Sequence, residues 1–177
     1  MTLPIMPRDA SVAEIFSEAS KLKAKKDKIE FLSQYKNRKD MEHIIKGAYH
    51  PAIVWLVPNG PLPEGVQFSD VPAVDLADDR LIRAHRQFQY LVKGGPDMKQ
   101  AKREDIYLNI LRSVHESEAK LLMSVVGKKI PYKGMTRALM LETFPDWLPV
   151  SNTLTDLERR ICHVIGLSAI RKLSRTK

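Results

Sequence analysis

The fold is decided by the stretch KLLMSVVGKKIPYKGMTRALMLETFPDWLP, residues 120–149. Its first part predicts one apolar face of a helix, formed by Leu121, Leu122, Val125 and Val126. Gly127 is the expected end of this helix, because glycine readily adopts the left-handed conformation of a helix C-cap. A basic loop around Pro131 then separates this helix from the next one.

A second, shorter helix is expected after Thr136, because its hydroxyl is a good N-terminal cap. The apolar residues of this helix are Leu139, Met140 and Phe144. The helix must end before Pro145, because a proline nitrogen has no hydrogen to donate and the residue before proline avoids helical geometry. Residues 120–149 therefore predict a helix, a basic loop and a short helix.

A helix is also expected near the N-terminus, where Ser11 and Glu14 have the spacing of a capping box. Its apolar side consists of Val12, Ile15, Phe16, Ala19 and Leu22. Lysines gather at its end, at Lys21, Lys23, Lys25, Lys26 and Lys28. Because cations near a helix C-terminus complement the helix dipole, we interpret these lysines as a solvated face.

The remaining sequence also favours helices. Apolar residues recur at helical spacing over residues 29–35, 40–47, 81–92 and 98–114. Asp97 is the expected cap of the last of these helices. We therefore predict an all-α fold, with an extended arm at residues 1–10 and a compact multi-helix domain at residues 11–150.

Two segments interrupt this helical pattern. The hexamer AIVWLV at residues 52–57 is compatible with a strand or with a buried helical turn, because periodicity does not decide for so short a run. Residues 58–75 contain four prolines and predict a long surface loop. Loops of this length are often functional, although a tolerated insertion would have the same composition.

A C-terminal amphipathic helix with a basic tail is expected over residues 151–177. Thr155 and Glu158 form another capping box, and Leu157, Ile161 and Ile165 continue at helical spacing. This helix either packs on the domain with its tail toward a polyanion, or docks on a partner. The same segment also leaves a dimer open as an alternative.

The composition is that of an ordinary globular protein, but the charge is not. The 177 residues are 44% hydrophobic and carry a net charge of +8, which favours association with polyanions such as DNA or RNA. The single cysteine, Cys162, excludes an intramolecular disulfide and fits a reducing compartment. No apolar run is long enough for a membrane span or a signal peptide, so we expect a cytoplasmic protein.

Sequence motifs for catalysis are absent. The histidines are dispersed, with no HExxH pair, and the chain has neither a CxxC motif nor a phosphate-binding GxxxxGK[ST] loop. Cys162 lies on an apolar helix face and is expected to be buried. We therefore expect no enzymatic activity, no metal site and no cofactor.

The sequence resembles the N-terminal all-helical DNA-binding domain of T4-type ATP-dependent DNA ligases. The lysine-rich helix of that family is similar to KAKKDKIEFLSQYK at residues 23–36. Its late helix–turn–helix pattern is similar to SVVGKKIPYKGMTRALMLETFPDWLP at residues 124–149, with Gly127, Phe144, Pro145, Leu148 and Pro149 in corresponding places. The chain departs from the family at Val126, where a cysteine is usual, and in a longer loop at residues 128–135. It also resembles small uncharacterised proteins of tailed phages.

The resemblance implies a DNA-binding module. No KxDG adenylation motif occurs in the chain, so ligation itself is excluded. Together with the basic charge, this predicts a non-catalytic protein that binds phosphates, with duplex DNA favoured and little dependence on sequence. The competing interpretations are a protein-interaction adapter that docks through the 58–75 loop or the C-terminal helix, and a virion component.

The candidate DNA contacts lie mainly in the basic loop, where four cations occur between residues 128 and 137 without a carboxylate. The expected contacts are Lys128, Lys129, Tyr132, Lys133, Gly134, Thr136 and Arg137, with Lys99, Lys102 and Arg103 as a second group. Tyr132 is expected either to stack on a sugar or base or to be buried. The N–H groups of the helix after Thr136 are expected to favour a phosphate. A solvated connection that binds nothing remains the alternative for this loop.

Overall fold

The structure, a computed structural model, describes residues 4–150. It is all-α, with these elements: α1 (Val12–Lys21), α2 (Lys25–Ser33), α3 (Lys39–Tyr49), η1 (Val74–Leu76), α4 (Leu81–Ala84), η2 (His85–Tyr90), α5 (Gln100–Ser113), α6 (Glu116–Val126) and α7 (Arg137–Thr143). η1 and η2 are 3-10 helices. Among residues 4–150, extended pairing is limited to isolated bridges.

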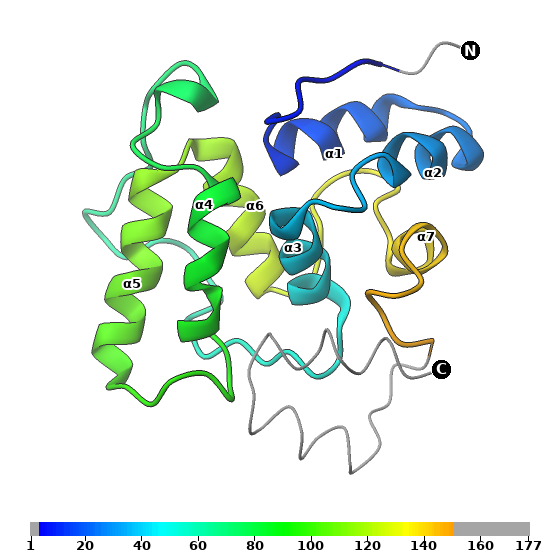
Figure 1. Cartoon of the computed structure of the whole chain (residues 1–177). Helices are drawn as coiled ribbons and strands as arrows, with labels where there is room; N and C mark the ends of the chain where they lie inside the picture. Colours follow the sequence, from blue (N-terminus) through cyan, green and yellow to red (C-terminus); the bar gives the residue numbers. More distant parts are fainter. Residues whose placement is uncertain (1–3, 151–177) are drawn as a thin grey trace.

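The helices form a compact bundle around α3 and α6. These two helices pack against each other at the centre, with α4, η2 and α5 on one side and α1, α2 and α7 on the other (Figure 1). Completely buried aromatic rings from both sides meet this centre, at Phe16, Phe31 and Phe88. The bundle therefore has one continuous hydrophobic core.

The first helix follows the sequence prediction. The Ser11 hydroxyl accepts the N–H of Glu14 at 3.1 Å, and the N–H of Ser11 donates to the Glu14 carboxylate at 2.8 Å. This reciprocal capping box satisfies two N–H groups that a helix start otherwise leaves without partners. The predicted apolar side is buried against the core.

Gly47 allows α3, α6 and the segment after α3 to approach closely. A Cβ atom at this position would lie 2.7 Å from the Trp55 ring and 2.9 Å from the side chain of Val125. The Trp55 indole N–H donates to the Gly47 carbonyl at 3.1 Å. Residues 52–57 form neither a regular strand nor a helix: Ala52 lies in a turn, and Trp55 forms an isolated bridge with Val92.

The helix predicted over residues 81–92 is wrong as a single α-helix. The chain forms one α-helical turn in α4 and then tightens into the 3-10 helix η2. At the junction, a ring nitrogen of His85 lies 3.2 Å from the Leu81 carbonyl oxygen, which also accepts the backbone N–H of His85. The side chain thus competes for the carbonyl that an α-helix would use alone.

The predicted cap at Asp97 is also wrong. α5 begins at Gln100, and its N-cap is Lys99, which makes no side-chain capping bond. A tertiary contact fixes this start, because the Gln100 amide donates to the Leu56 carbonyl at 2.8 Å. The same amide also donates to Glu104, one turn later in α5, at 2.7 Å. The helix therefore begins two residues later than a cap at Asp97 requires.

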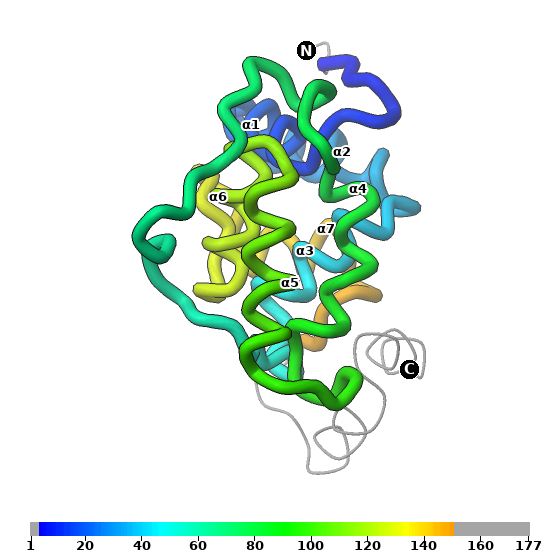
Figure 2. The backbone as a smooth tube through the Cα atoms, turned by 90° about the vertical axis from the view of Figure 1, so that its left-hand side faces the viewer, coloured from blue at the N-terminus to red at the C-terminus, as the bar shows by residue number. Residues whose placement is uncertain are grey.

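The long segment between α3 and α4 runs along the outside of the bundle past α6 (Figure 2). Apart from η1, residues 58–79 contain no helix. The segment is held by a bridge between Ser69 and His115 and by Lys120, whose ammonium lies 5.9 Å from the centroid of the Phe68 ring. The expected C-terminal helix at residues 151–177 lies outside the described residues.

Candidate nucleic-acid interface

The basic loop begins at the end of α6, in a different way from the sequence prediction. Gly127 has a φ of −74°, and the left-handed residue is Lys128, with a φ of 63°. The N–H of Lys128 donates to Val125 and that of Lys129 to Ser124, which is a Schellman ending with lysine at the position usual for glycine. A lysine is strained there, so other contacts must hold it in place.

Those contacts come from the Lys128 ammonium. Its Nζ lies 3.1 Å from the carbonyl oxygen of Gly47, 3.2 Å from that of His50 and 2.5 Å from that of Ile53. All three N–H donors are occupied at the C-terminus of α3, where a cation complements the helix dipole. Burial lowers the pKa of Lys128 to about 8, so it remains mainly protonated at neutral pH. Lys128 therefore has a structural role at the end of α3, and the phosphate contact expected of it stays a prediction.

The following loop is packed onto the bundle. Ile130 is buried, and the Tyr132 ring lies 6.1 Å from the Phe16 ring, centroid to centroid. The Tyr49 hydroxyl donates to the Met135 carbonyl. Burial raises the pKa of Tyr132, in agreement with a ring packed against the core. The structure thus supports the buried alternative for Tyr132 rather than stacking on a base.

Lys28 links this loop to α2. The side chain is largely buried, and its Nζ lies 3.4 Å from the Lys133 carbonyl oxygen. Gly134 follows with a φ of 81°, and a Cβ atom there would lie only 2.6 Å from Lys28 Nζ. Glycine suits this position because its backbone conformation is left-handed, and the absence of a side chain leaves room for the Lys28 ammonium. The role of Gly134 is therefore to let the loop meet α2.

This contact brings two lysine-bearing segments together. Lys23 and Lys26 are exposed at the junction of α1 and α2, and Lys129 and Lys133 are exposed in the loop before α7. We call these four side chains the basic surface. No carboxylate within residues 4–150 forms an ion pair with them. Figure 1 shows the α1–α2 junction and α7 on the same side of the bundle.

Other lysines near the basic surface are paired. Lys25 forms an ion pair with Glu142 of α7, and Lys21 forms one with Glu18 one turn earlier in α1. Both pairs are largely exposed, so each stabilises the fold only slightly. Their main consequence is that the cationic character of this side rests on the four lysines of the basic surface.

Thr136 and Arg137 act within the fold. The Thr136 hydroxyl accepts the N–H of Leu139 at 3.3 Å, which confirms the predicted cap. α7 has only seven residues, so its dipole is small and gives little support to the phosphate expected at its start. The Arg137 guanidinium donates to the Pro149 carbonyl and ties the helix to the segment that follows it. Arg137 and the start of α7 therefore have roles within the fold, and their expected phosphate contacts stay predictions.

The second predicted group of DNA contacts, Lys99, Lys102 and Arg103, includes one buried residue and two exposed ones. Arg103 is buried and donates to the Tyr90 carbonyl, so it is a structural residue rather than a phosphate contact. Lys99 and Lys102 are exposed at the start of α5. α5 and α7 lie at opposite sides of the bundle (Figure 1), so these lysines are not brought to the basic surface.

Sequence reasoning missed Lys23 and Lys26 as members of this surface. Their run of cations in KAKK was visible, but it was interpreted as a solvated helix end. What joins them to the loop is the contact between Lys28 and Lys133, which are 105 residues apart. No local sequence pattern predicts a contact between residues so far apart in the chain.

Residues 4–150 contain neither a side-chain cluster for a metal ion nor a helix for a membrane span. No group of three or more histidine, cysteine, aspartate or glutamate side chains is arranged to hold a metal ion there. In the same part of the chain, no helix is long and apolar enough to cross a membrane.

Comparison with known proteins identifies a family. No curated protein and no solved structure matches the chain. The model of the family of unknown function DUF6433 matches residues 15–132, from α1 into the basic loop. This match spans more than half of the sequence and includes the α1–α2 junction and Lys128. The chain therefore belongs to the family of unknown function DUF6433.

Proposed function

We propose that the protein is a non-catalytic nucleic-acid-binding module whose basic surface contacts the phosphates of duplex DNA. The observation that carries this proposal is the contact between Lys28 and Lys133, which places the loop that bears the exposed Lys129 and Lys133 against α2, the helix that follows Lys23 and includes Lys26. Lysines present compact charges without the planar geometry that reads base edges, so binding is largely independent of sequence.

The way the loop is held supports this proposal. Lys129 and Lys133 lie on a segment that is fixed at both ends, by Lys128 on the end of α3 and by Tyr49 on Met135. Charges on a fixed segment lose less conformational freedom on binding than charges on a mobile one. Affinity should come mainly from the release of counterions from the DNA, with a slope of about −0.9 in log–log salt dependence for each neutralised phosphate.

The resemblance to ligase DNA-binding domains supports the same function. It rests partly on residues 23–36, which include Lys23 and Lys26. The resemblance to small tailed-phage proteins favours a role in phage DNA metabolism. Ligation is not part of the proposal, because the chain contains no KxDG motif.

The test is direct binding of the purified protein to a fluorescent DNA duplex at several salt concentrations, with single-stranded DNA and RNA as competitors. Micromolar or tighter binding that weakens linearly on a log–log salt plot supports the proposal. Stronger competition by single-stranded DNA or by RNA would show that the preferred ligand is that nucleic acid rather than duplex DNA. Absence of binding at low salt would refute the proposal.

A further inference from the structure

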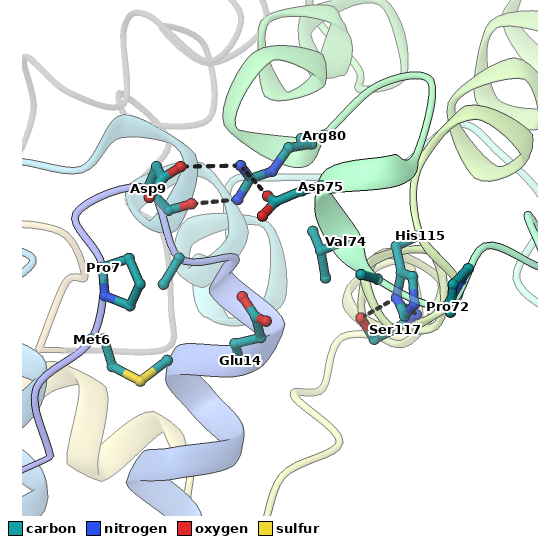
Figure 3. Close-up of a pocket in the computed structure, with 12 residues that line it drawn as sticks. Met6, Pro7, Asp9, Glu14, Pro72, Val74, Asp75, Arg80, His115 and Ser117 are labelled. Atoms are coloured by element: carbon teal, nitrogen blue, oxygen red, sulfur yellow. Dashed lines mark hydrogen bonds and ion pairs between the residues drawn. The ribbon is translucent and has the colours of Figure 1, made fainter.

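A feature separate from the basic surface lies at the N-terminal end of α1. A cleft of about 370 Å³ opens between the N-terminal arm, the segment around η1 and the start of α6 (Figure 3). This volume is at the lower end of the range of about 300–1,000 Å³ for ligand pockets, so it suits one or two side chains rather than a large cofactor. The lining includes Met6, Pro7, Pro72, Ala73 and Val74.

The walls of the cleft are held in place by two arginines. Arg80 forms ion pairs with Asp75 at 2.9 Å and with Asp9 at 3.4 Å, and it also donates to the Asp9 carbonyl. Arg38 donates to the carbonyls of Arg8 at 3.1 Å and Ala10 at 2.8 Å. The arm is therefore fixed against both η1 and the bundle, and the cleft is formed before any partner arrives.

The cleft combines an apolar lining with carboxylates. Asp9, Glu14 and Asp75 line it together with a single guanidinium, that of Arg80. The side chains of Asp9 and Asp75 are 69% and 79% exposed, so both pairs leave carboxylate surface open to solvent. In Figure 3 the carboxylate of Glu14 is directed into the space between Pro7 and Val74.

Exposed apolar side chains adjoin this lining. Ile5, next to Met6 in the arm, is 94% exposed, and Leu76, at the end of η1, is 61% exposed. Large apolar side chains that border an apolar cleft are typical of a protein-interaction surface.

The charge around the cleft differs from that of the whole protein. Three carboxylates and one guanidinium line the cleft, although the chain as a whole has a net charge of +8. One of these carboxylates, Asp75, belongs to the acidic segment 47–79, which contains five carboxylates and no lysine or arginine. An anionic partner would be repelled here, and Arg80 is already engaged by two carboxylates. Charge complementarity therefore selects a cationic partner.

We propose that this cleft binds a short exposed segment of a partner protein in which a large apolar side chain stands beside a lysine or arginine. The apolar side chain enters between Met6, Pro7 and Val74, and the cation lies against Glu14 and the open side of Asp75. The site is independent of the basic surface. It lies at the start of α1, a helix of ten residues and therefore about 15 Å long, whose other end leads to Lys23 and Lys26.

The test is a selection of random twelve-residue peptides displayed on phage, with the immobilised full-length protein as the target. The expected result is enrichment of peptides that carry lysine or arginine beside leucine, isoleucine, phenylalanine or methionine. Ala73→Arg fills the cleft and adds a cation, so it should weaken binding of an enriched peptide by at least about tenfold. Gln67→Arg is the matched control, because Gln67 is exposed in the same acidic segment but does not line the cleft.

Leu76→Ser is a second variant, which leaves the core intact because Leu76 is exposed. This variant should also weaken binding of the enriched peptide, while DNA binding by both variants stays unchanged. No enrichment over bare support, enrichment of acidic peptides, or equal weakening by Ala73→Arg and Gln67→Arg would each overturn the proposal. Because the readout is peptide binding, its failure is distinct from failure of DNA binding.

Discussion

The ammonium of Lys128 lies 3.1 Å from the carbonyl oxygen of Gly47, a residue 81 positions earlier in the chain. This contact joins the end of α6 to the end of α3 and fixes the start of the basic loop. Two adjacent lysines in the loop consequently have different roles. The ammonium of Lys128 donates to three carbonyl oxygens at the end of α3, whereas Lys129, which is also exposed, belongs to the basic surface.

Replacement of these two lysines separates stability from binding. Lys128→Met leaves the Ile53 carbonyl without its donor, which costs about 1–3 kcal/mol. It also takes one donor each from the carbonyls of Gly47 and His50, which keep the Trp55 indole N–H and the Ile53 N–H. We expect the free energy of unfolding, measured with urea, to fall by about 2–4 kcal/mol. Lys129→Met should leave stability within about 0.5 kcal/mol of the wild type and weaken DNA binding instead. Equal stability of the two variants would contradict the structural role of Lys128.

Gly134 provides a second test of the loop. Gly134→Ala places a methyl group 2.6 Å from Lys28 Nζ in a backbone conformation that alanine avoids. We expect a loss of about 1–2 kcal/mol in the free energy of unfolding. Gly60→Ala is the control, because Gly60 has no atom within 4 Å of the added carbon and should change stability little. A fully stable Gly134→Ala protein would contradict the left-handed backbone conformation at this position.

Glu118 makes stability depend on pH. Its side chain is buried, and burial raises its pKa from 4.5 to about 7, while Leu81 donates an N–H to it at 3.0 Å. Between these pH values the folded protein binds more protons than the unfolded chain, so the free energy of unfolding falls as pH rises. Glu118→Gln keeps the acceptor and cannot ionise. At pH 8 it should be more stable than the wild type by up to about 3 kcal/mol, with little difference at pH 4.5. Urea unfolding across this pH range measures how the free energy of unfolding changes with pH. The same pH dependence for Glu118→Gln and the wild type would refute the raised pKa of Glu118.

His43 changes stability with pH in the opposite direction, over a pH range that overlaps that of Glu118. Burial and the neighbouring His85 lower its pKa from 6.5 to about 4. The unfolded chain binds more protons between these values, so the contribution of His43 to stability is lost as pH falls from 6.5 toward 4. His43→Asn retains a donor for the His85 carbonyl, which lies 3.4 Å from the ring nitrogen. We expect this variant to lose less stability than the wild type on acidification over the same range. A steeper loss would contradict the prediction.

Local chemistry in the sequence predicted several elements well. The capping box of Ser11 and Glu14 and the cap at Thr136 both occur, because a cap depends on residues only three positions apart. The all-α fold and the burial of Leu139 and Met140 follow from helical spacing in the same way. These signals lie within single helices, so one sequence is enough to recognise them.

Other features depend on contacts between distant segments. The sequence alone suggested Gly127 for the left-handed position, but the ammonium of Lys128 supplies the contacts that move this conformation by one residue. Asp97 is a reasonable cap by local chemistry, but the hydrogen bond from Gln100 to the Leu56 carbonyl fixes a later start of the helix. Likewise, the basic surface needs Lys28 beside Lys133, and nothing local distinguishes its exposed lysines from structural ones.

The central claim is that the basic surface, rather than net charge alone, binds DNA. The measurement is the salt dependence of duplex binding for two variants that each lose four cations. One replaces Lys23, Lys26, Lys129 and Lys133 by glutamine. The other replaces Lys93, Lys99, Lys102 and Arg112, which are exposed on or near α5, and has the same net charge.

The account predicts that the first variant loses most of its affinity at moderate salt and that its log–log salt slope becomes shallower by about 3–4. The second variant should keep a slope close to that of the wild type. Equal losses in the two variants would show that only total charge matters. A larger loss in the second variant would move the binding site to α5 and contradict the account.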